Sequence, residues 1–189
     1  MAIYSSEYHK IKPSQQLLRG FVVFCSQNRN MNYPTENTGA EFSECGKYRY
    51  ALWRIWDNAL PLVMFIGFNP STADSLENDN TMKSVIRISK QNGYGGVYMM
   101  NLFGIISKDP DIVERDGIDP MGGNLNCHIK VSPLCKDVVF AWGGFKQALL
   151  VSGDFEKTYP NALCIGKNKN GSPKHPLYKS GKSVLIRYR

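Results

Sequence analysis

The sequence predicts an α/β domain with three layers, in which a central, mostly parallel four-stranded sheet lies between helices. Four apolar segments, at residues 62–68, 96–103, 137–142 and 162–165, have the composition of buried strands. Helical patterns alternate with them at residues 80–91, 123–131 and 145–151. Such alternation favours right-handed crossovers, which make neighbouring strands parallel and cover both faces of the sheet.

Two further patterns refine this prediction. Residues 48–56 alternate in a strand-like way, and the turn signal Asp57-Asn58 predicts a hairpin into the strand at 62–68. The helix at 80–91 has an apolar stripe of Met82, Val85, Ile86 and Ile88. Residues 41–189 are expected to form the domain. Residues 1–40 form a polar extension, with one candidate strand or short helix at 17–25 and no assignable chemistry.

Composition limits the classes of protein that remain. The 189 residues fit one domain, and 42% apolar residues suffice for a sizeable core. No apolar run reaches the roughly 20 residues of a membrane helix, and no leader pattern precedes the domain, so we expect a cytoplasmic monomer. The cysteines have no paired metal-ligand spacing, which predicts reduced thiols, no metal and no cofactor. These cysteines are Cys25, Cys45, Cys127, Cys135 and Cys164.

The net charge of +7 is concentrated at the C-terminal end. Residues 161–189 contain seven basic and no acidic side chains, whereas the remaining 16 basic and 16 acidic residues cancel. A segment of this kind can neutralise phosphates, although a solvated basic tail is the simpler interpretation. Glycine, proline, His175 and Tyr178 interrupt the run, which is typical of a loop that approaches a ligand closely.

Four loops are expected to meet at the carboxyl ends of the parallel strands, where α/β sheets bind their ligands. They are residues 69–74, 101–103, 142–145 and 167–182. Asn69, after a buried strand and before Pro70, either makes an ordinary turn or positions a water or polar substrate group. An amide is too weak a base for more than orientation, so it suits a reaction whose leaving group departs early.

Other polar residues at this edge have two interpretations each. Asn101, at a strand end, bonds either to backbone or to a ligand, and its paired donor and acceptor suit a pyrimidine edge. His175 is either structural or functional. The acids Asp74, Glu77 and Asp79 favour helix capping over metal binding. Motifs for serine hydrolases, kinases, nucleotide-phosphate loops and zinc proteases are absent from the sequence.

The motifs resemble those of the uracil-DNA glycosylase superfamily. GFNPS at 67–71 is similar to the GxNP motif of the mismatch-specific and thymine-DNA branch, and VYMMNLF at 97–103 is similar to the base-reading strand of the superfamily. FAWGG at 140–144 resembles the segment after its third strand, and KHPLY at 174–178 resembles its His-Pro loop. The chain departs from that pattern by NPST instead of NPG, and by having no serine after Pro176.

A second resemblance covers about three quarters of the chain. From Phe42 onward the sequence is similar to a bacterial and phage family with a domain of unknown function, which carries FSxCGxYRYxLWRxWD, NPSTAD, GYGG, NLF and HPLY segments. This resemblance is specific, but it implies no activity.

The glycosylase resemblance implies a uracil-DNA glycosylase-like fold and a monofunctional enzyme that flips out a uracil-like or modified pyrimidine and hydrolyses its glycosidic bond. Asn69 and His175 would be catalytic, one aiming water and the other stabilising the departing base. Base-binding residues would be Phe68, Ser71, Asp74, Asn101 and Phe103. DNA-binding residues would be Trp142, Gly143, Lys167, Lys169, Lys174, Leu177, Tyr178, Lys179 and Lys182.

The partner would be single- or double-stranded DNA. The polar loops around Asn30 and Asp74 favour a bulky modified base, which would be consistent with defence against phage. Two alternatives remain open. One is a protein that modifies or transfers a DNA base, or a non-catalytic reader of nucleic acid, on the same fold. The other is a protein-interaction module without salt-dependent DNA binding.

Overall fold

The computed structural model describes residues 38–71, 78–177 and 183–189. They form one mixed sheet with the strand order β1-β2-β4-β3-β5-β6-β7. The strands are β1 (Thr38–Phe42), β2 (Arg49–Ile55), β3 (Leu62–Gly67), β4 (Gly96–Asn101), β5 (Asp137–Phe140), β6 (Leu163–Cys164) and β7 (Ile186–Arg187). The α/β class is therefore confirmed.

The four predicted strands form the parallel centre of the sheet. β3 pairs in parallel with β4 and with β5, and β5 pairs in parallel with β6. The prediction of a four-stranded sheet was wrong, because antiparallel strands extend both edges: β1 and β2 beside β4, and β7 beside β6. The predicted hairpin was also wrong. β2 pairs with β4, with Leu52 opposite Met99, and not with β3.

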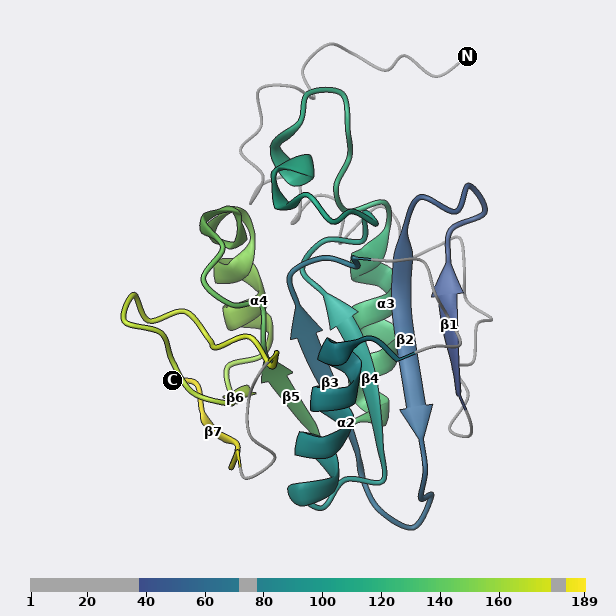
Figure 1. Ribbon diagram of the computed structural model, residues 1–189, viewed down its shortest axis with the longest axis vertical. Helices are drawn as coiled ribbons and strands as arrows, with labels where there is room; N and C mark the ends of the chain where they lie inside the picture. Colours follow the sequence, from purple (N-terminus) through teal and green to yellow (C-terminus); the bar gives the residue numbers. More distant parts are fainter. Residues whose placement is uncertain (1–37, 72–77, 178–182) are drawn as a thin grey trace.

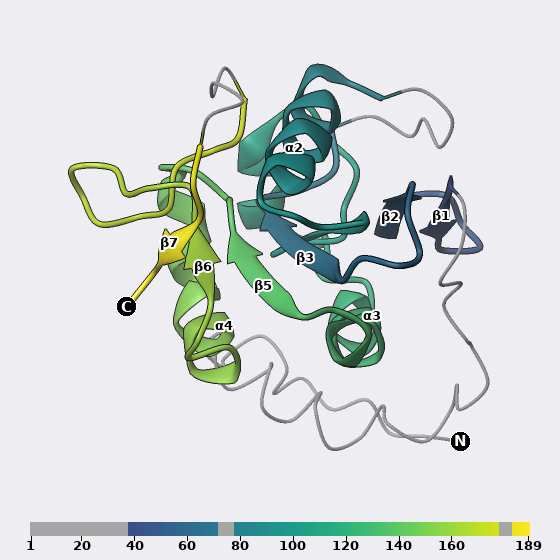
Figure 2. The ribbon, with the colours of Figure 1, turned by 90° about the horizontal axis from the view of Figure 1, so that it is seen from below.

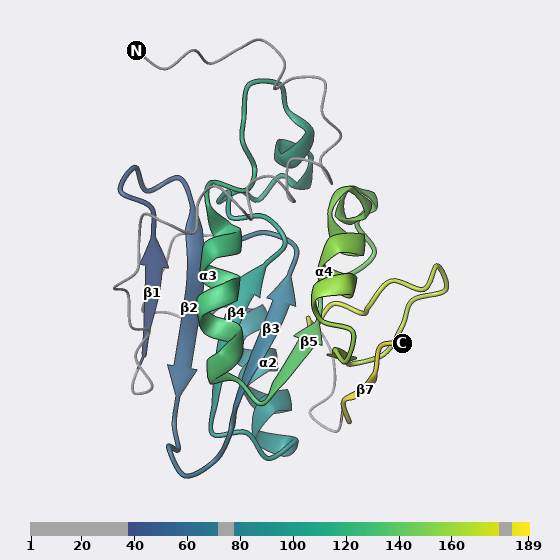
Figure 3. The same ribbon diagram turned by 180° about the vertical axis from the view of Figure 1, so that it is seen from behind.

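Within the described residues, three α-helices cover the two faces of the sheet: α2 (Asn80–Gln91), α3 (Asn124–Val131) and α4 (Ser152–Thr158). Figure 2 shows α2 on one face and α3 with α4 on the other, and Figure 3 shows the latter pair from the front. Three short 3₁₀ helices connect the elements: η3 (Pro110–Glu114), η4 (Ser132–Leu134) and η5 (Lys146–Leu150). The helix predicted at 145–151 is the 3₁₀ helix η5.

Alternating side chains divide the core between the two faces. Val63 and Phe65 of β3 pack with the α2 side, whereas Met64 and Ile66 pack with α3 and α4. On α2, Val85 and Ile88 are completely buried, and each such side chain contributes about 1.5–3 kcal/mol to stability. The stripe predicted for this helix is confirmed.

Helix α2 has the boundaries that its sequence predicts. The side chain of Asp79 accepts a hydrogen bond from the backbone N–H of Met82 at 2.7 Å, so the predicted capping role of this acid is confirmed. After Asn92, Gly93 has a φ of 79°, in the left-handed region that glycine adopts without a steric penalty. These signals fix the position of α2 between β3 and β4.

Candidate functional site at the carboxyl edge of the parallel strands

The carboxyl ends of β3, β4 and β5 point to the same edge of the sheet, toward the top of Figure 1. Backbone bonds continue the pairing beyond the strands. The N–H of Leu102 donates to the carbonyl of Gly67 at 2.9 Å, and that of Phe103 to the carbonyl of Phe68 at 3.0 Å. Residues 67–71 and 101–107 therefore lie side by side, as the sequence predicts.

Asn69 fixes the loop that follows β4. Its Nδ2 atom donates to the carbonyl oxygens of Pro70 (3.2 Å), Ile105 (3.3 Å) and Ser107 (2.9 Å). The N–H of Ser107 returns a bond to the carbonyl of Pro70 at 2.8 Å. None of the residues in the described ranges donates to the Oδ1 atom of Asn69. The amide is thus oriented by its nitrogen, and its oxygen remains an acceptor.

Asn101 lies beside the same segment, paired in register with Gly67. The residue is only 3% exposed, yet its side-chain amide makes no hydrogen bond to any residue that the structure describes. A Cβ atom at position 67 would lie 2.7 Å from Oδ1 of Asn101 and 2.6 Å from Cε of Met99. Glycine in the GFNPS motif therefore makes room for this amide.

Two residues of α3 hold the backbone of Asn101. Nδ2 of Asn124 lies 2.7 Å from its carbonyl oxygen, and Nε2 of His128 lies 2.8 Å from the same atom. Since a carbonyl only accepts, Nε2 carries the proton of the imidazole. Burial lowers the pKa of His128 to about 4, which keeps the ring neutral. Sequence analysis missed both residues, although their i, i+4 spacing on a predicted helix was a usable signal.

Three aromatic rings stack at this edge. Phe68, 4% exposed, meets Phe103 edge-on with ring centroids 5.3 Å apart. Phe145, which follows β5 and which sequence analysis did not select, stacks on Phe68 at 4.5 Å with an interplanar angle of 25°. Phe103 is 1% exposed and belongs to the core, whereas Phe145 is 41% exposed. The accessible ring is that of Phe145.

His175 approaches the edge from the C-terminal loop. Its Nδ1 atom accepts a hydrogen bond from the N–H of Leu177 at 3.2 Å, which leaves the proton of the neutral ring on Nε2. Burial lowers its pKa below the ordinary value of 6.5, and the charge of Asp79 opposes this shift. Gly143 has a φ of 81°, and a Cβ there would lie 3.2 Å from Cβ of His175 and 3.8 Å from the ring of Phe145.

The predicted DNA-binding residues fall into different environments. Lys167 and Lys169 are exposed, and Lys174 and Leu177 are half-buried. Nζ of Lys167 lies 5.3 Å from the ring centroid of Tyr188. The ion pairs within the described part of the chain involve none of these three lysines. They are therefore available to an anionic partner.

The remaining predicted residues have simple placements. Trp142 is 2% exposed and packs in the core against Phe140 and Tyr188, so its ring is not presented to a ligand. Ser71 is exposed. The predictions for Asp74, Tyr178, Lys179, Lys182 and the segment 17–25 lie outside the described residues.

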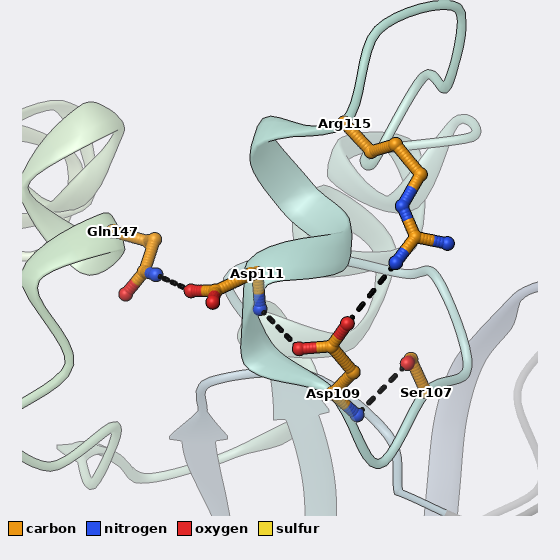
Figure 4. A network of polar contacts seen from close by, with 5 residues as sticks. All are labelled: Ser107, Asp109, Asp111, Arg115 and Gln147. Carbon is orange, nitrogen blue, oxygen red and sulfur yellow. Dashed lines mark hydrogen bonds and ion pairs between the residues drawn. The ribbon is translucent and has the colours of Figure 1, made fainter.

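A polar network joins the loop above the site to η5 (Figure 4). Asp109 caps η3 by accepting from the N–H of Asp111 at 3.0 Å and pairs with Arg115 at 3.1 Å. The side chain of Gln147 donates to the carboxylate of Asp111. Because Gln147 lies two residues after Phe145, this contact ties the aromatic stack to the loop that Asn69 also holds.

Some expected features can be compared only within the described residues. There, no group of three or more His, Cys, Asp or Glu side chains could hold a metal ion. Cys45, Cys127, Cys135 and Cys164 are free thiols. Across residues 38–71, 78–177 and 183–189, no helix has both the length and the apolar character needed to cross a bilayer.

The fold and this edge define an α/β protein with a mixed seven-stranded sheet, whose parallel strands present amides, an imidazole and an aromatic stack at one end. The chain belongs to the protein family of unknown function DUF1643, whose model matches residues 49–177. Comparison with curated proteins and with solved structures gives no match.

Proposed function

We propose that this protein is a monofunctional DNA glycosylase, which flips out a uracil-like or modified pyrimidine and hydrolyses its glycosidic bond to leave an abasic site. One observation carries the proposal. Asn69, oriented through three backbone carbonyls, keeps Oδ1 as an acceptor, and the side-chain amide of Asn101, at the end of the neighbouring strand, makes no hydrogen bond within the described residues. A water acceptor and a base-reading amide on adjacent strand ends are what hydrolytic excision requires.

In this mechanism Oδ1 of Asn69 accepts a hydrogen bond from the attacking water and aims its oxygen at the anomeric carbon. The glycosidic C–N bond breaks early, its electron pair leaves with the base, and the sugar becomes oxocarbenium-like before water adds. The water then loses a proton to solvent or to the departed base. No strong base is needed, which fits an amide.

His175 would stabilise the departing base. Its neutral ring donates through Nε2–H, because Nδ1 accepts from the backbone of Leu177. A donor aimed at an oxygen of the base anion stabilises the charge that develops in the transition state. Asn101, with a donor and an acceptor side by side, would read the pyrimidine edge.

The C-terminal lysines would bind the phosphates on either side of the flipped nucleotide. Lys167, Lys169 and Lys174 have no acidic partner among the described residues. Binding energy from such contacts offsets the few kcal/mol that unstacking a base costs. Leu177, with Tyr178 beyond it, would fill the gap left in the duplex. We further propose a uracil-DNA glycosylase-like fold, a cytoplasmic monomer and a role against modified phage DNA.

The test is product formation from oligonucleotides that carry uracil, mismatched thymine, or hydroxymethylated or glucosylated cytosine. We expect an abasic product that survives until alkali treatment, and no covalent adduct on borohydride reduction. A trapped adduct would contradict the hydrolytic mechanism, and intact DNA from every substrate would contradict the function.

Asn69→Ala should abolish excision, but it also removes the bonds to Ile105 and Ser107. Asn92→Ala is a matched control, because Asn92 donates to the carbonyls of Ile88 and Ser183 at 2.9 Å each, at the amino-terminal edge of β4. Asn92→Ala should lower the thermal stability comparably and keep the excision rate. Equal rates for both variants would contradict a catalytic role for Asn69.

A second candidate function on the same fold involves no hydrolysis: the protein would modify or transfer a base, or would only read nucleic acid. The specific observation that favours it is the engagement of Nδ2 of Asn69 with three carbonyls, as expected of a structural asparagine. For a reader, Asn69→Ala would retain DNA binding, and the wild type would yield no abasic sites.

A further inference from the structure

Phe145 occupies an unusual position for a large apolar side chain. One face of its ring stacks on Phe68 at 4.5 Å, yet 41% of the residue is exposed. Phe68 is enclosed, since Phe145 covers it on one side and Phe103 meets it edge-on at 5.3 Å. A base that enters this edge therefore meets Phe145 and not Phe68.

The ring of Phe145 is also held in place. It precedes η5, in which Gln147 donates to Asp111 of η3, and this bond anchors the segment to the loop above the site. A Cβ at Gly143 would lie 3.2 Å from Cβ of His175 and 3.8 Å from the ring of Phe145, so the glycine leaves room for both residues. A ring fixed beside an imidazole donor needs little further ordering when it binds a planar partner.

We propose that Phe145 forms a stacking subsite for an unpaired nucleobase at the carboxyl edge of the sheet. The proposal rests on the proposed function only for the identity of the ligand as a base of nucleic acid. Stacking on an aromatic ring tolerates every base, so this subsite would supply affinity, while Asn101 and His175 would supply selectivity.

A scattered exposed apolar residue is common and by itself indicates nothing. Leu149 provides the comparison: it lies in η5 and is 80% exposed. What distinguishes Phe145 is its ordered ring over Phe68, next to His175. Lys146, also exposed, adds a positive charge beside the ring.

The experiment uses the full chain and a short single-stranded oligonucleotide that carries a fluorescent cytosine analogue, whose emission is quenched when the base stacks. Wild-type protein should bind the oligonucleotide and quench its emission. Phe145→Leu, which keeps apolar cover over Phe68, should weaken binding about 10-fold or more and remove the quenching. Phe145→Trp should retain both properties.

Leu149→Ala is the matched control and should leave binding and quenching unchanged. Undiminished quenching by Phe145→Leu, or no binding by wild type, would overturn the proposal. Binding and quenching do not depend on bond cleavage. If they depend on Phe145 while no substrate yields abasic sites, the glycosylase function fails and the stacking subsite stands.

Discussion

His128 donates a hydrogen bond from Nε2 to the carbonyl oxygen of Asn101 at 2.8 Å, with only 2% of the histidine exposed. Asn124 donates to the same oxygen at 2.7 Å. Two side chains of α3 thus fix the end of β4, from which the amide of Asn101 projects. This arrangement requires a neutral ring in a position that solvent does not reach.

The first prediction is a pH-dependent loss of stability that arises from His128. Its pKa is about 4 in the folded protein and 6.5 ordinarily, so the unfolded chain binds the extra proton first as the pH falls. Stability should therefore decrease from pH 6.5 down to about 4 and level off below, by about 3 kcal/mol from this group. Urea unfolding across this range measures the loss. In His128→Asn the dependence should be much smaller, and an unchanged dependence would contradict the assignment.

Gly67→Ala should impair base recognition without unfolding the protein. The new Cβ would lie 2.7 Å from Oδ1 of Asn101, so that amide must move, whereas Cε of Met99, 2.6 Å away, is the end of a flexible side chain. We expect about 10-fold weaker binding of a substrate oligonucleotide and a small drop in melting temperature. Gly153→Ala, with nothing within 4 Å of the added Cβ, is the control and should bind normally.

The sequence predicted the parts of the fold that local patterns encode. Helix α2 has its predicted limits because Asp79 and Gly93 terminate an apolar stripe. The partner of β2 could not be predicted, since the turn after it suits either a hairpin or a crossover, and packing against β4 decides. Strand β1 carries no apolar run, and β7 has only two residues, so neither strand gave a clear signal in the sequence.

The candidate site, too, could be predicted only where local sequence patterns encode it. The loops that follow β3 and β4 were predicted to meet, and parallel pairing brings these strand ends together, with Gly67 opposite Asn101. The partner of His128 is a backbone carbonyl, which a sequence does not reveal, so the i, i+4 spacing with Asn124 on a predicted helix was the one signal for this pair. Phe145 was missed because only the folded chain shows which aromatic rings remain exposed.

Lys169→Ala should weaken DNA binding uniformly across sequences. Lys169 is exposed and has no ion-pair partner within the described residues, so it can replace counterions on a phosphate. The slope of log K against log salt should fall by about 1. Lys136→Ala is the control, since that exposed lysine precedes β5 at the opposite edge. Equal effects of the two substitutions would show that DNA binding depends on the net charge of the protein and not on contacts at this edge of the sheet.

His175→Ala should slow single-turnover excision by about 10²–10³-fold, as expected when one donor to a developing anion is removed. Because burial holds the pKa of His175 below 6.5, the ring is neutral above that pH, and the wild-type rate should not change there through this group. At pH values below the pKa of His175, the added proton on Nδ1 would break the bond from the N–H of Leu177 that orients the ring, so the rate should fall. His175→Gln, which retains an N–H donor, should be faster than His175→Ala. Its rate should not fall at low pH, because glutamine does not titrate. A rate that rises as the pH falls would show that the imidazolium is the active form.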